Sequence, residues 1–290
     1  MTPLNVFVIA DYGPPDDMAF GEVEQKILGH YHGTLGDCDA THSDRPITVS
    51  NYSVPAFNTV ATGFKLAQLA INSSLGDMQK FFVNTAPRKD DANARKQNDG
   101  EKFVYAKLFN GIEICAVNSG HSLSFIKSSA EEIRAINCAS AGSQFRSRDV
   151  FPEAFVKIIK GDRSLLGRDL MDEIPEPPKD CVAVIDGHGN IKTTLTEEKV
   201  GHLKGKKATV TMIDPEDRNK QHHEVMDVAE GMFAVRDGRL CMFPGSSGWT
   251  DKTGVKHVFY EVAVRGGNAA RKFGYPERHF IKVSPHEPKP

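Results

Sequence analysis

Asp11 is the first residue of the chain whose type and position could do chemistry. It follows Val6–Ala10, a short apolar run rich in branched residues that is typical of a buried strand of a parallel sheet. A glycine and two prolines then break the chain, and Asp16 precedes a helix expected to start near Met18. Asp11 is therefore expected outside the carboxyl end of a strand, where such sheets bind ligands. A carboxylate there could accept hydrogen bonds from a ribose diol, or it could cap its own turn.

Three other segments combine residue types that could bind a ligand, and each also has a structural interpretation. Residues 145–152, FRSRDVFP, place two arginines and a serine before an apolar helix, where Ser147 or Asp149 could be a helix cap. Residues 185–190, IDGHGN, run from a strand into a glycine-rich turn, and such residues are common in hairpin turns. Residues 243–249, FPGSSGW, fit a loop or the amide-lined wall of a pocket equally well.

The polar segment 84–102, NTAPRKDDANARKQNDGEK, is rich in arginine and lysine and could bind an anion or be solvated surface. It contains no phosphate-loop pattern, and no GxGxxG follows the first strand. The chain also lacks a GxSxG nucleophile elbow. The histidine pairs 30/32 and 222/223 have no cysteine or carboxylate at ligand spacing, so we expect no metal site.

Composition excludes several classes of function. The chain has 290 residues, of which 39% are hydrophobic and 26% charged, with a net charge of −2, so neither nucleic acid nor a membrane surface is an expected partner. No apolar run reaches membrane-spanning length, and Val6–Ala10 is too short for a signal-peptide core and lacks a basic flank, so we expect no signal peptide. The five cysteines are scattered without a CxxC pair, which is typical of a reducing cytoplasm.

The elements that must position these residues divide into two groups. Before residue 178, strands expected at Val6–Ala10, Lys80–Val83 and in a hairpin around Asn110-Gly111 are interspersed with helices. A proline-rich linker follows at Met171–Asp180. Beyond it lie only short strand candidates separated by turns. The sequence thus predicts an α/β domain with a central, largely parallel sheet over 1–178 and an all-β, barrel-like domain over 179–290.

Six segments together resemble one family, the S-adenosylmethionine hydroxide adenosyltransferases, which also contains the fluorinases and chlorinases. The first three are IADYGPPDDMAFGEVEQKIL at 9–28, DATHS at 39–43 and FRSRDVFP at 145–152. The others are VIDGHGN at 184–190, PGSSGW at 244–249 and EVAVRGGNAARKFG at 261–274. They occur in the family's order and at suitable spacing through nearly the whole chain.

The resemblance implies a cytoplasmic homotrimer with each site formed between the N-terminal domain of one subunit and the C-terminal domain of the next. Water or halide would attack C5′ of S-adenosylmethionine and release methionine, with no cofactor. Asp11 would bind the ribose hydroxyls. The remaining substrate-binding residues would be Asp16, Phe145 and Ser147 on the nucleoside and reaction-centre side, Asp186, Ser246 and Ser247 for the methionine part, and Asn190, Arg265 and Ala269 at the adenine edge or the neighbouring wall.

Departures from the family pattern affect the residues that orient water. The hydrolases have an aspartate and an arginine after their second strand and a histidine in the Arg146 position. Here the carboxylate position holds Ala86 in one alignment or Asn84 in another, and Arg88 or Arg95 could replace the arginine. Candidate catalytic residues are therefore Asn84, Arg95, Arg146 and Ser147, of which Ser147 is what fluorinases carry. Three functions stay open: a hydrolase with a degenerate water-activating set, a non-catalytic binder of adenosyl compounds, and a halide-using transferase.

Overall fold

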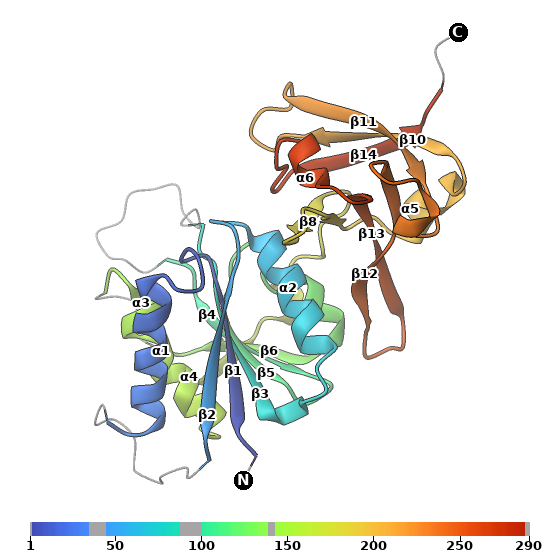
Figure 1. Cartoon of the computed structure of the whole chain (residues 1–290). Helices are drawn as coiled ribbons and strands as arrows, with labels where there is room; N and C mark the ends of the chain where they lie inside the picture. The colour runs from blue at the N-terminus through green and yellow to red at the C-terminus, as the bar shows by residue number, and fades with distance from the viewer. Residues whose placement is uncertain (1, 35–44, 88–99, 139–142, 288–290) are drawn as a thin grey trace. The chain divides into compact units, whose positions relative to one another are not determined.

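The computed structural model describes residues 2–34, 45–87, 100–138 and 143–287 (Figure 1). The chain forms two compact units, Met1–Glu176 and Pro177–Pro290. The division falls inside the proline-rich segment Met171–Asp180.

The first unit contains a sheet of seven strands in its described part, in the order β2-β1-β3-β5-β4-β6-β7. These strands are β1 (Leu4–Ala10), β2 (Ile47–Ser53), β3 (Gln79–Asn84), β4 (Phe103–Leu108), β5 (Glu113–Val117), β6 (Ala130–Ile136) and β7 (Leu166–Asp169). The pairs β2–β1, β1–β3 and β3–β5 are parallel, whereas β5–β4, β4–β6 and β6–β7 are antiparallel.

The expectation of a central, largely parallel sheet is therefore wrong, because the sheet is mixed. The Asn110-Gly111 turn reverses the chain between β4 and β5, and Gly111 adopts the positive φ of 84° that such a turn requires. A hairpin pairs its two strands antiparallel, and β6 and β7 continue that pattern outward from β4. Only the half of the sheet that contains β1 and β3 has the parallel geometry expected at Asp11.

Helices cover both faces of this sheet (Figure 1). They are α1 (Met18–Tyr31), α2 (Thr59–Ile71), α3 (Arg146–Asp149) and α4 (Phe151–Ile159), with short 3₁₀ turns η1 (Gly76–Met78), η2 (Ser124–Ser129) and η3 (Met171–Glu173). Helix α1 begins at Met18 as expected, because the Asp17 side chain accepts a hydrogen bond of 2.9 Å from the nitrogen of Ala19.

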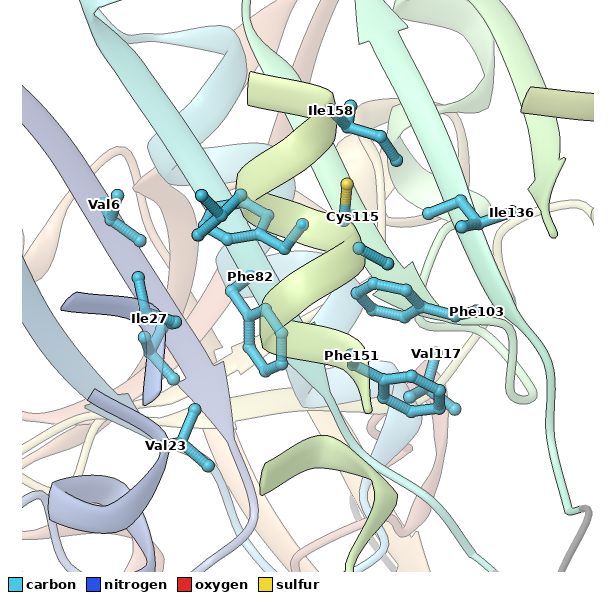
Figure 2. Packing of buried hydrophobic residues seen from close by; sticks show 14 of the residues in the cluster. Val6, Val23, Ile27, Phe82, Phe103, Cys115, Val117, Ile136, Phe151 and Ile158 are labelled. Carbon is cyan, nitrogen blue, oxygen red and sulfur yellow. The ribbon is translucent and has the colours of Figure 1, made fainter. Parts of the chain in front are cut away.

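Apolar side chains of the sheet, α1 and α4 form one core (Figure 2). Phe82 on β3 packs edge-on against Phe155, and Phe103 on β4 stacks on Phe151 with ring centroids 4.3 Å apart. Val6 on β1 belongs to the same buried cluster. Burial of these aromatic rings fixes the start of α4 and with it the FRSRDVFP segment, whose last two residues, Phe151 and Pro152, open that helix.

The second unit has a seven-stranded sheet in the order β14-β10-β11-β12-β13-β9-β8. Its strands are β8 (Val182–Ile185), β9 (Ile191–Thr193), β10 (Lys207–Ile213), β11 (Gln221–Val228), β12 (Leu240–Thr250), β13 (Lys256–Val264) and β14 (Phe280–Pro285). It also contains α5 (Glu197–Val200), α6 (Ala269–Lys272), η4 (Gly201–Leu203) and η5 (Met232–Ala234).

The sheet of this unit is curled like the barrel-like domain expected from the sequence, but the unit is not all-β. Its sheet is mixed, since β11 pairs with β12 in parallel, and short helices accompany the strands. The sheet curls until its two edges meet at an isolated bridge between Cys181 and Phe280. The β10–β11 pair is a regular antiparallel ladder, but the crossover from β11 to β12 contains η5, which breaks the run of hairpins.

Among the described residues, no helix combines the length and apolar character needed to cross a membrane. Cys115, Cys138, Cys181 and Cys241 are free thiols.

Candidate functional site

Asp11 lies at the carboxyl ends of two neighbouring parallel strands. The β1–β3 register pairs Ala10 with Asn84, and the next amide, that of Asp11, donates to the Asn84 carbonyl at 3.3 Å. The Asp11 carboxylate accepts a hydrogen bond of 2.8 Å from the backbone nitrogen of Phe57. Phe57 is exposed and has a φ of 59°, a strained conformation for an aromatic residue. Asp11 therefore lies directly after the end of β1 and also stabilises the loop before α2.

Tyr12 is the residue on which three predicted site residues converge. Burial is the main cause that raises the pKa of its phenol well above the ordinary value, and the charge of Asp11 acts in the same direction. The nearby side chains of Ser147 and then Asn84 oppose that rise. Sequence analysis did not select Tyr12, although it directly follows Asp11 in the first motif.

The hydroxyl oxygen of Tyr12 is buried and has no well-formed hydrogen bond to any described residue. Its ring packs edge-on against Phe20 at 5.0 Å and Phe145 at 5.7 Å between centroids. The two contacts hold the phenol in one orientation between α1 and the segment that starts α3. Phe145, expected to line the nucleoside, thus belongs to this group.

Ser147 and Asn84 reach the group from elements far apart in sequence. Ser147 lies in α3 and is 5% exposed, and Asn84 ends β3 and is 8% exposed. Neither Ser147 nor Asp149 caps α3, and neither caps the apolar helix α4, whose N-cap is Val150 without a side-chain hydrogen bond. Instead Asp149 pairs with Arg148 at 2.7 Å on the surface, and hydrogen bonds from Arg148 and then Ser143 lower the pKa of Asp149 to about 2. The helix-cap interpretation of the segment is therefore wrong.

Arg146 makes its contacts elsewhere in the unit. Its Nη1 atom lies 3.4 Å from the carbonyl oxygen of Gly100, and its guanidinium lies 5.3 Å from the centre of the Phe151 ring. A Cβ added at Gly100 would lie 2.8 Å from Nη2 of Arg146, so the glycine makes room for this side chain. The structure thus packs Arg146 against Phe151 and Gly100, while Ser147, one residue on, faces Tyr12.

Other predicted residues of this unit have separate places. Asp16 is exposed in the loop before α1 and is not part of the Tyr12 group. Arg95, Arg88 and the DATHS segment at 39–43 lie outside the described residues. His121 has Nδ1 3.1 Å from the Ser124 hydroxyl, and burial lowers its pKa.

In the second unit, Glu261 and Lys192 organise the residues expected to bind the methionine part. They face each other in the β13–β9 pairing, with Nζ of Lys192 2.8 Å from Oε1 of Glu261. The same oxygen accepts from the Ser246 nitrogen at 3.0 Å and lies 3.4 Å from the hydroxyls of both Ser246 and Ser247. Lys192 also lies 3.9 Å from Asp186. Asp186, Ser246 and Ser247 are therefore brought together by a buried ion pair.

Lys192 and Glu261 were missed because each looks like an ordinary strand residue in isolation. Glu261 is 4% exposed, although a lone glutamate is rarely buried. Gly245 is the sequence feature that could have indicated the close packing at Glu261. A Cβ at position 245 would lie 2.2 Å from Cγ of Glu261, so only glycine fits there. A bulge in β12 between Pro244 and Gly248 turns the two serines toward the carboxylate.

Asp186 also caps its own turn. Its Oδ1 atom accepts from the nitrogens of His188 and Asn190, each at 3.0 Å, and its Oδ2 atom accepts from Nδ2 of Asn190 at 3.1 Å. Gly189 has a φ of 80°, and its carbonyl accepts from the nitrogen of Ala270 in α6 at 2.8 Å. The turn interpretation of this segment is thus confirmed, and Asn190 is held by Asp186. The buried Ala269 starts the helix to which this turn is joined.

Arg265 contacts a different loop. Its Nη1 atom donates to the carbonyl of Val235 at 2.7 Å, and its guanidinium lies 5.4 Å from the centre of the exposed Phe233 ring. Arg265 therefore holds the η5 region in place. No group of three or more His, Cys, Asp or Glu side chains placed to hold a metal occurs in the part of the chain that the structure describes.

Comparisons with known proteins identify the fold. No protein-family model and no curated protein matches the chain. It is similar to a solved structure of an uncharacterized conserved protein from Thermotoga maritima, with a TM-score of 0.66, 18% identity and coverage of 96% of this chain and 99% of that one. A conserved hypothetical protein from Thermus thermophilus gives a TM-score of 0.60 at 16% identity, covering 98% of this chain and 100% of that one. At these identities the likeness establishes a shared fold over nearly the full length.

Proposed function

We propose that this protein binds S-adenosylmethionine and transfers its adenosyl group to water, giving adenosine and methionine. One observation carries the proposal. Asp11, Asn84 and Ser147 come from three distant segments and meet around Tyr12, at the carboxyl ends of β1 and β3. Nucleosides bind at this edge in open sheets with parallel strands. The order of the motifs along the chain, which resembles the hydroxide adenosyltransferases, supports the same substrate.

In the proposed reaction the main task of the protein is to position a water molecule and the substrate relative to each other. The water oxygen forms a bond to C5′ while the C5′–S bond breaks, and the bonding electron pair stays on sulfur as the neutral thioether of methionine. The proton lost by the new hydroxyl goes to solvent. Asp11 accepts hydrogen bonds from the ribose hydroxyls, while Asn84 and Ser147 hold water in line with C5′ in a partly dehydrated pocket. Phe145 lines the nucleoside, and Asp16 and Arg95 complete the proposed set in this unit.

The Glu261–Lys192 group has the chemistry to bind the amino-acid end of the substrate. Asp186 and Glu261 are acceptors for an ammonium group, and Lys192 is a donor for a carboxylate. Ser246 and Ser247 add neutral hydroxyls. Asn190, Arg265 and Ala269 would lie toward the adenine edge. We further propose a homotrimer in which the first unit of one subunit and the second unit of the next share each site, and a cytoplasmic location.

A non-catalytic binder of adenosyl compounds is the second candidate, and Arg146 favours it. Arginine stays charged and cannot act as a base, and this one is packed against Phe151. Neither Ala86 nor Asn84 supplies a carboxylate. These features predict slow turnover if the protein is a hydrolase and no turnover if it is a binder.

The test is turnover and binding by the full chain. We expect S-adenosylmethionine in water to give adenosine on chromatography, and added chloride or fluoride to give no 5′-halogenated nucleoside. Asp11→Asn should weaken adenosine binding in calorimetry by roughly 1.5–3 kcal/mol, through loss of charge-assisted hydrogen bonds. The matched control is Asp162→Asn, an exposed turn aspartate. Binding without turnover would select the non-catalytic candidate, and unchanged affinity of Asp11→Asn would refute the ribose assignment.

A further inference from the structure

The Tyr12 hydroxyl is a buried polar group without a well-formed hydrogen bond to any described residue. Such groups are uncommon in native proteins, because a buried hydroxyl that has lost water and gained no partner destabilises the fold. Phenylalanine would fill the same space between Phe20 and Phe145 without that cost. A hydroxyl at this place therefore points to a ligand atom that the phenol contacts in the working protein.

The groups around the Tyr12 hydroxyl indicate which kind of ligand atom it contacts. Ser147 and Asn84, both almost fully buried, approach it and offer a hydroxyl and a carboxamide. All three groups are neutral, and each can donate a hydrogen bond. The nearby carboxylate of Asp11 makes the place unfavourable for an anion. Neutral donors beside a carboxylate suit a water molecule better than a halide ion.

We infer that Tyr12 is a third nucleophile-holding residue, which together with Asn84 and Ser147 fixes one water molecule in front of C5′ of the bound nucleoside. The inference rests on the proposed function, and it names the group that takes the place of the missing carboxylate and histidine. Tyr12 orients the water by hydrogen bonding and does not remove its proton. The phenol is protonated, and hence a donor, throughout the neutral range, because even the ordinary tyrosine pKa of about 10 lies above that range.

The position of Tyr12 allows it to perform this task without motion. Its ring is fixed by two edge-on aromatic contacts, and its backbone directly follows Asp11, the proposed ribose ligand. The residue that holds the sugar and the residue that holds the water are therefore consecutive on the same strand end. Such rigid placement of a nucleophile against its target is a main source of rate acceleration when the leaving group is already good.

The first measurement is a high-resolution crystal structure of the full chain with adenosine. We expect an ordered water within hydrogen-bond distance of the Tyr12 hydroxyl, Asn84 and Ser147, on the C5′ side of the ribose, and its loss in Tyr12→Phe. This readout does not depend on turnover. If wild type binds adenosine but hydrolyses nothing, the hydrolase function fails, while the electron density still decides the role of Tyr12. Adenosine density without a water on the Tyr12 hydroxyl overturns the inference.

The second measurement is the steady-state kinetics of Tyr12→Phe. Loss of one neutral hydrogen bond to the attacking water should lower kcat about three- to tenfold with KM within about twofold. Tyr31→Phe is the matched control, because Tyr31 donates to the Arg45 carbonyl at the far end of α1 and should leave both constants unchanged. Equal kcat values for wild type and Tyr12→Phe, or a loss confined to KM, would also overturn the inference.

Discussion

Nζ of Lys192 lies 2.8 Å from Oε1 of Glu261, across the point where β9 and β13 pair. Their side chains are only 17% and 5% exposed, so the pair is largely removed from water. A buried charge is tolerated only when it is paired and hydrogen-bonded, and Glu261 meets this condition through Lys192, Ser246 and Ser247. The ion pair therefore both supports the curled sheet and shapes the group proposed to bind an amino acid.

Glu261→Gln should destabilise the second unit by about 3 kcal/mol, because it leaves Lys192 charged without its main partner. Urea unfolding measures the change. The double variant Lys192→Met, Glu261→Gln should recover part of the loss, since no unpaired charge then remains. If the single and double variants were equally unstable, the loss would have to come from the serine hydrogen bonds instead.

Gly189→Ala should destabilise the protein more than Gly205→Ala does. Both glycines have a positive φ, 80° and 75°, so the backbone strain of alanine is shared. A Cβ at Gly189 would lie 2.2 Å from Cγ of Asn268, whereas nothing lies within 4 Å at Gly205. Asn268 caps α6 by accepting from the nitrogen of Arg271, so its displacement should add about 1 kcal/mol.

Urea unfolding of both variants, with hydrogen exchange at the Ala270 amide that bonds to Gly189, tests this prediction. Equal stability of the two variants would show that the turn at 186–190 can move away from α6 without cost.

The sequence was informative where one local pattern decides the structure. The start of α1 and the Asn110-Gly111 hairpin depend on neighbouring residues and were found. Two other features depend on how distant segments pack and pair, which hydrophobic periodicity does not report. These features are the convergence of Asn84 and Ser147 on Tyr12 and the pairing of Lys192 with Glu261. The predicted fold class was wrong for a related reason. The hairpin makes β4 antiparallel to β5, and β4 also pairs antiparallel with β6, so the sheet is mixed and not largely parallel.

Acid should weaken the first unit through Glu113. Burial works to raise the pKa of its carboxyl, but hydrogen bonds from Lys80 at 2.7 Å, Tyr105 at 2.8 Å and Arg163 outweigh it, so the pKa lies below its ordinary value. A lowered folded-state pKa stabilises the protein above the unfolded value of about 4.3, and this stabilisation is lost as the pH falls through the folded-state pKa.

The stability difference between wild type and Glu113→Gln should therefore be greatest at neutral pH and shrink below about pH 4. Urea unfolding between pH 7 and pH 3 measures it, with the half-exposed Glu131→Gln as control. A difference that did not change over this range would show that Glu113 is not ionised in the folded protein.

Under the proposed function, Arg146→His should not raise the rate of S-adenosylmethionine hydrolysis, although it introduces the residue that the hydroxide adenosyltransferases carry. Arg146 is held by the Phe151 ring and the Gly100 carbonyl, and the two positions that align with the hydrolases' carboxylate hold Ala86 and Asn84, which are both uncharged. Loss of the cation–π contact should lower stability by about 0.5–1 kcal/mol. Adenosine release followed by chromatography, together with urea unfolding, gives both numbers.

The neighbouring Arg148 provides the matched control for this last change. It pairs with Asp149 and Glu22 on the surface, so Arg148→His should leave the hydrolysis rate as it is in wild type.

Adding Asn84→Asp to Arg146→His introduces a carboxylate, but it places that charge near the Asp11 carboxylate and in the group that faces Tyr12. Repulsion between the two acids should then raise the pKa of the new one and limit any gain in rate. A large increase from Arg146→His alone would mean that the side chain at position 146 reaches the water despite its packing on Phe151, and that the arginine is what makes the wild type slow.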